Sequence, residues 1–224
     1  MTLRDILEET RDKLDDKTAP FLWSDTEILR FANRSVNRLS KGAYLISDAS
    51  TVAVCQIALT LALGADYTKH TKIIKVRWAR LTGYTQPIQA VDLNWLEQHY
   101  SSWQSAAPSV PKYLTEDLTT GKITFIPAPD AVYTANLVVY RLPLTDLVLT
   151  VLTAAPEIPE RYHEYILPGI LAEAYLKQDA ETFDKKLATD YLMIFESQIK
   201  KAFRENFMST GVPTTVNMHR GHVG

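Results

Sequence analysis

The chain has 224 residues, of which 46% are hydrophobic and 22% are charged, and its formal net charge is −2. This composition is that of an ordinary globular protein, and the length is sufficient to bury a core. The charge balance argues against a general attraction to nucleic acid or to an anionic membrane. Cys55 is the only cysteine, so an internal disulfide and a zinc cluster built from cysteines are both excluded.

Residues 1–48 are predicted to form a helical hairpin. The first helix follows Thr2 and ends near Asp16, because its apolar residues recur at helical spacing. They are Leu3, Ile6, Leu7 and Leu14. In the second helix, Ser24 can cap the free backbone N–H groups, and Glu27 can reach back to the amide of Ser24. The apolar stripe of this helix consists of Ile28, Leu29, Ala32, Val36 and Leu39.

Residues 49–157 are predicted to form an inserted β domain. The apolar run 49–65 is too short and too interrupted to span a bilayer, so we interpret it as strand and core. The stretch 73–81 alternates, which places Val76 and Trp78 on the same face of a strand. Further strands are expected over 112–114, 121–126 and 133–141, and a short helix over 92–100. We expect about five to seven strands in a small sandwich or curled sheet.

Residues 158–207 are predicted to form a second helical pair. Its first helix contains Pro168 and Gly169. An interior proline destabilises a regular helix by about 3 kcal/mol, so a kink is predicted at this position. The last helix starts at Ala180 and continues toward Phe207. Residues 208–224 contain no acidic residue and little apolar content, which predicts a flexible tail. The predicted fold is α+β: a four-helix bundle from N- and C-terminal hairpins, with an inserted small β-sheet or sandwich domain and a flexible C-terminal tail.

Three motifs occur in a distinctive order along the chain. They are 23–28 followed by an Asn-rich helix, 121–130, and 158–165 leading into 172–179. In this order they resemble the head-to-tail adaptor, or connector, proteins of tailed bacteriophages. They resemble in particular the adaptors of short-tailed, T7-like phages related to tubular tail protein A.

The resemblance implies a structural protein of the virion, located at the head–tail junction and assembled in the host cytoplasm. It implies a ring of about twelve copies that joins the portal protein to the tail nozzle or tube protein. Double-stranded DNA would pass through the lumen without sequence-specific binding, and no membrane is involved. The portal-docking residues would lie in the tail: Met208, Val212, Pro213, Val216, Met218, His219 and Arg220. The residues facing the tail or nozzle would be Trp95, Tyr100 and Trp103.

No catalytic, cofactor-binding or metal-binding residues are predicted, so the chain is not expected to be an enzyme. His163 and Glu164 form only half of an HExxH zinc motif, because Leu167 replaces the second histidine, and we interpret them as a surface pair. A hydrolase acting on the cell wall would need an acid/base pair or a nucleophile that the sequence does not provide. The remaining alternative is a receptor- or glycan-binding tail component with an exposed aromatic groove around Trp95 and Trp103.

Overall fold

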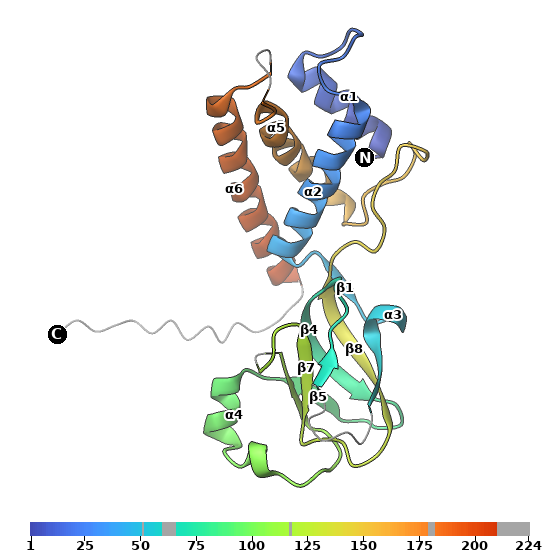
Figure 1. Ribbon diagram of the computed structural model, residues 1–224, viewed down its shortest axis with the longest axis vertical. Coiled ribbons are helices and arrows are strands. Elements are labelled where there is room, and N and C mark those ends of the chain that lie inside the picture. Colours follow the sequence, from blue (N-terminus) through green and yellow to red (C-terminus); the bar gives the residue numbers. More distant parts are fainter. Residues whose placement is uncertain (51, 60–65, 117, 179–181, 210–224) are drawn as a thin grey trace, which may run out of the picture.

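In the computed structural model, the described residues are 1–50, 52–59, 66–116, 118–178 and 182–209. The molecule is elongated, with helices at one end and a β-sheet at the other (Figure 1). Each end has its own cluster of buried apolar side chains. The chain therefore consists of two stacked parts, each with a core of its own.

The two N-terminal helices are α1 (Leu3–Leu14) and α2 (Asp25–Ala43), and both begin with a capping box. In α2, the Ser24 amide donates to Glu27 at 2.9 Å, while the Glu27 amide donates to the Ser24 hydroxyl at 3.3 Å. These reciprocal bonds satisfy backbone N–H groups that the helix leaves free. The predicted helix start at Ser24 is confirmed, and the buried stripe of α2 contains Ile28, Ala32, Val36 and Leu39.

The C-terminal helical part differs from the expected pair of long helices. Residues Glu160–Ile166 form a 3₁₀ helix (η2), and α5 covers only Leu167–Tyr175. Pro168 lies in the first turn of α5, where its missing N–H would have no intrahelical partner in any case. The predicted kink is therefore wrong, because the proline begins a helix. The last helix, α6, covers Lys185–Ser209, and the predicted start at Ala180 lies outside the described residues.

The eight described strands form one curled, mixed sheet in the order β1-β8-β4-β5-β6-β7-β3, and β2 also pairs with β8. The pairings are antiparallel except for the parallel pair β5–β6. The bounds are β1 Ile46–Asp48, β2 Gln56–Leu59, β3 Asp66–Thr68, β4 Ile73–Leu81, β5 Pro87–Ala90, β6 Tyr113–Thr115, β7 Lys122–Ile126 and β8 Tyr133–Arg141. Short helices in this part are α3 (Val52–Cys55), α4 (Leu93–His99) and the 3₁₀ turn η1 (Trp103–Ser105).

The predicted fold, a four-helix bundle with a small inserted domain, is wrong. The sheet has more strands than expected and makes up one of the two main parts of the molecule. Among the helices, α1 packs on α2 and α5, while α6 packs on α2 and α5 from the other side. Because η2 replaces the first turns of the expected third helix, α5 is too short to complete a regular bundle.

The apolar run 49–65 was expected to be strand and core. Its described part begins with the short helix α3, and only then does strand β2 follow; residues 60–65 lie outside the described part. Cys55, at the end of α3, is buried against the sheet. Within the described ranges, no helix is both long and apolar enough to cross a membrane.

Candidate functional site

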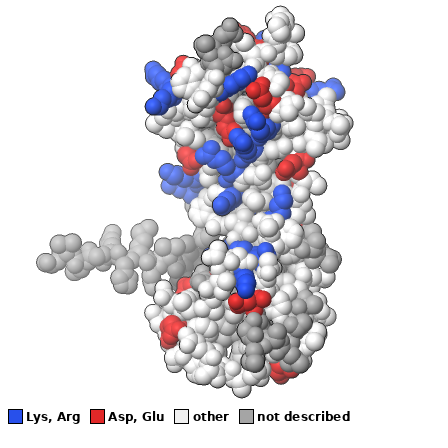
Figure 2. Space-filling model, in the orientation of Figure 1, with Lys and Arg blue, Asp and Glu red and all other residues white. Residues whose placement is uncertain are grey.

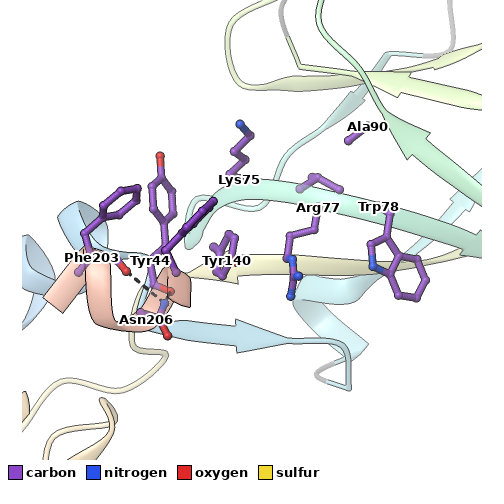
Figure 3. Close-up of a pocket in the computed structure, with 11 residues that line it drawn as sticks. Tyr44, Lys75, Arg77, Trp78, Ala90, Tyr140, Phe203 and Asn206 are labelled. Carbon is purple, nitrogen blue, oxygen red and sulfur yellow. Dashed lines mark hydrogen bonds between the residues drawn. The ribbon is translucent and has the colours of Figure 1, made fainter. Parts of the chain in front are cut away.

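A groove of about 620 Å³ lies where the helical part meets the sheet (Figure 3). The C-terminal ends of α2 and α6 form one side, and strands β4 and β8 form the other. Its lining is Ala43, Tyr44, Lys75, Val76, Arg77, Trp78, Ala90, Tyr140, Phe203, Asn206 and Phe207. Aromatic rings and two basic side chains therefore dominate the surface of the groove.

The helical side of the groove is fixed by the way α2 ends. Tyr44 is the C-cap of α2 and adopts a left-handed conformation with φ 50° and ψ 46°. Its ring centroid lies 5.2 Å from that of Tyr140 and 6.1 Å from that of Phe203. The side-chain amide of Asn206 donates to the carbonyl oxygens of Ala43 at 3.2 Å and Tyr44 at 2.7 Å. This amide joins α6 to the last carbonyl groups of α2, which the helix itself leaves without partners.

The sheet side of the groove depends on irregularities in β4. The pairing of β4 with β8 shifts register between Ile73 and Lys75 and again between Val76 and Trp78. Each extra residue reverses the alternation of faces. Val76 therefore pairs with the buried Val139 and is itself buried, whereas Trp78 pairs with Val138 and is half-buried. The prediction that Val76 and Trp78 share one face is therefore wrong, because the strand contains these shifts.

The groove carries positive charge next to aromatic surface. The guanidinium carbon of Arg77 lies 5.2 Å from the ring centroid of Tyr140, and its Nη1 donates to the Ser47 hydroxyl at 3.4 Å. Lys75 is exposed at the rim. Among the described lining residues there is no carboxylate, histidine, serine or cysteine that could act as a base or nucleophile. The arrangement is suited to binding apolar or acidic groups.

An ion network built on the buried Arg141 and Asp48 connects the sheet to the chain segment that leads back to the helices. Arg141, at the end of β8, donates through Nε to Asp48 of β1 at 2.5 Å and through Nη2 to Glu157 at 2.6 Å. Glu157 also accepts the Leu144 amide at 2.7 Å. Burial by itself lowers the pKa of Arg141, but its bonds to Glu157 and Asp48 raise that pKa above its ordinary value. The guanidinium is thus held charged at the junction between the two parts.

The aromatic residues predicted to face the tail lie on and after α4, at the far end of the sheet part (Figure 1). Trp95 stacks on His99 with centroids 4.6 Å apart and also lies 5.1 Å from the ring of Tyr113. Tyr100 contacts the same Tyr113 ring at 6.1 Å. Trp103 is not part of this ring cluster; its indole N–H donates to Glu97 at 3.0 Å. All three predicted residues are half-buried.

The predicted portal-docking residues fall mostly outside the described part of the chain. Met208 is described: it is 82% exposed, near the end of α6. Val212, Pro213, Val216, Met218, His219 and Arg220 lie beyond residue 209, outside the described ranges. Their role stays a prediction.

The interpretation of His163 and Glu164 as a surface pair needs a correction, because His163 is buried in η2. Its Nε2 donates to the carbonyl oxygen of Ile158 at 2.9 Å, since a carbonyl group can only accept. Glu164 is exposed. In the described chain, no group of three or more His, Cys, Asp or Glu side chains is arranged to hold a metal ion.

Sequence reasoning missed the groove, because its walls come from the ends of α2 and α6 and from strands β4, β5 and β8, which only the tertiary fold brings together. The groove and the ion network both lie where the helical part and the sheet part meet. The chain matches the family model described as SU10 adaptor protein over residues 1–216 and belongs to that family. This confirms the resemblance to phage head-to-tail adaptors and makes the protein a phage structural protein and virion component. No curated protein matches the chain.

Proposed function

We propose that this adaptor forms a ring that joins the portal to the tail and surrounds part of the DNA passage. The observation that carries the proposal is the family match, which extends over nearly the whole chain and includes both the helical part and the sheet. A joining protein needs two separate docking surfaces. The elongated shape, with a separate core at each end, supports this role because each end can bind a different partner.

In this proposal the C-terminal segment docks on the portal, and the region of α4 faces the tail or nozzle protein. The α4 region projects from the sheet end, and α6 ends near the middle of the molecule (Figure 1). A segment that becomes ordered only on binding loses conformational entropy at that step, which weakens the contact of a single copy. Because the contact is repeated around a ring, the copies together bind the portal much more tightly than one copy would.

The charge of the chain is compatible with a DNA passage. A strongly basic lumen would bind the phosphate groups and oppose movement of the DNA. The formal net charge of −2 avoids such general attraction. The glycan-binding alternative has no observation in its favour, because Trp95 packs on His99 and Tyr113, and Trp103 donates to Glu97.

The test is the sedimentation mass of the purified chain, alone and after mixing with the assembled portal of the same virus. We expect a monomer or weak oligomer alone, and a portal whose mass rises by about twelve chains after mixing. Portal alone and an unrelated portal are the controls. A chain that stays free beside intact portal would contradict the proposed function.

A further inference from the structure

Helices α1 and α6 lie on opposite sides of the helical part, with α2 and α5 between them (Figure 1). Each buries one face toward this centre. The buried residues are Leu3, Ile6, Leu7, Thr10 and Leu14 in α1, and Ala188, Phe195, Ile199 and Ala202 in α6. The unburied faces of the two helices therefore point away from the molecule in roughly opposite directions.

The outward face of α6 carries apolar and mostly basic side chains, with the exposed acids Asp190 and Glu196 among them, and Glu196 is paired with Arg38. Met193 and Ile194 are 65% and 46% exposed. Lys186, Lys200 and Arg204 are exposed on the same side, as the helical repeat requires. Of the basic residues on the described α6, only Lys201 forms an ion pair within the helix, with Glu205. Figure 2 shows basic side chains, with acidic ones among them, along the side of the helical part where α6 lies.

The outward face of α1 has the opposite charge. Glu8, Glu9 and Asp12 are exposed; Glu8 and Asp12 lie away from the buried residues of α1, whereas Glu9 lines a pocket that α5 and α6 also line. The basic residues Arg4 and Lys13 lie on the two flanks of this face. Of the three acidic residues, Asp12 has a described ion pair, with Lys17, and both of those side chains are largely exposed. Such an exposed ion pair contributes little to stability, so the acidic face can still bind a basic partner.

An apolar segment lies against the N-terminal end of α1. Residues 142–159 run beside α1, where the Leu3 amide donates to the carbonyl oxygen of Ala154 at 2.7 Å. The segment exposes Val148 and Val151 at 46% and 47%, and Asp146 is exposed near them. Long connections without regular structure that are nonetheless held against a helix are commonly binding segments.

We propose that the outward face of α6 in one copy binds the α1 face and segment 142–159 of the next copy. This inference rests on the proposed ring and names the contact that builds it. Met193 and Ile194 would cover Val148 and Val151, while the basic residues of α6 approach the acidic residues of α1. The two surfaces are different and lie on opposite sides of one subunit. Such a head-to-tail contact repeats from copy to copy and closes into a ring when the rotation permits.

Charge reversal on either face tests the contact. One variant carries Lys200→Glu and Arg204→Glu, and a second carries Glu8→Lys and Asp12→Lys. Each variant then presents like charges to its own neighbours, so we expect each to lose ring assembly on the portal by sedimentation. An equimolar mixture restores opposite charges at every contact, and we expect the mass of the ring to return. Unchanged far-UV circular dichroism shows that the exposed substitutions leave the fold intact.

A matched control carries Arg80→Glu and Lys112→Glu, which reverse two exposed charges on the sheet part. This control should assemble like the wild type. If the face variants assemble normally, or if their mixture fails to recover the ring, the contact between α6 and α1 is overturned while the proposed function stands. If the wild-type chain itself never assembles on the portal, both proposals are overturned.

Discussion

The ring of Phe195 in α6 lies directly on the backbone of Gly169 in α5. A Cβ atom at Gly169 would be 3.0 Å from both Cε1 and Cζ of Phe195, and 2.6 Å from the hydroxyl oxygen of Ser35 in α2. Phe195 is fully buried. The missing side chain of one residue thus allows α2, α5 and α6 to meet at a single point.

Gly169→Ala should therefore destabilise the protein. Alanine favours a helix over glycine by roughly 0.5–1 kcal/mol, but overpacking a tight core costs typically about 1–3 kcal/mol. We expect a net loss of about 1 kcal/mol in the free energy of unfolding, measured by urea denaturation. In a Phe195→Leu background the clash with the ring is removed, so the same Gly169→Ala change should cost less. An equal effect in both backgrounds would contradict the close packing.

Local sequence signals were sufficient where the structure depends on neighbouring residues. Ser24 and Glu27 predicted the start of α2, since both bonds of a capping box lie within three residues. Asp92 likewise caps α4 within the short helix expected over 92–100. The strands β7 and β8 also fall within the predicted stretches, because alternation and turn residues act over a few positions.

The sequence was insufficient where distant segments decide the local structure. Pro168 is compatible with either a kinked helix or a helix start, and the choice follows from the packing of η2 and α5 against the other helices. The register shifts that place Trp78 on a different face from Val76 depend on the partner strand β8. The groove itself unites Tyr44, Trp78 and Phe203. The periodicity of one segment does not show which distant segments it will contact in the fold.

Replacing Arg141 should destabilise the protein more than removing any exposed ion pair would. Arg141→Met leaves Asp48 buried without the guanidinium, and loss of one partner of a buried pair typically costs about 3–5 kcal/mol. We expect a loss of that order in the free energy of unfolding, measured by chemical denaturation. The control is Arg34→Met, which removes an ion pair with Glu173 from a largely exposed arginine and should cost less than about 1 kcal/mol. Similar losses in both variants would show that the Arg141 network does not stabilise the junction.

Acid should weaken the start of α2 through Glu27. Hydrogen bonding to the Ser24 amide, which outweighs the effect of burial, holds the pKa of Glu27 below its ordinary value of 4.5. A carboxyl with a lowered folded-state pKa stabilises the fold above its unfolded pKa, and that stabilisation is lost as the pH falls through the folded value. The free energy of unfolding should therefore decrease below about pH 4.5 more steeply in the wild type than in Glu27→Gln. Identical pH profiles for the two proteins would contradict a role for the ionised carboxylate in the cap.

Removing residues 208–224 should separate folding from portal binding. The buried residues of α6 end at Ala202, and Asn206, which joins α6 to α2, is retained in a chain that ends at Phe207. The truncated chain should keep the melting temperature of the full chain, because no buried contact described in the helical core involves the removed part. Its binding to assembled portal should be lost, since the contact predicted to hold it there is gone. A full-length chain with Val212→Ser and Val216→Ser should fold normally and bind portal more weakly. Full portal binding by the truncated chain, measured by co-sedimentation, would show that another surface makes the attachment.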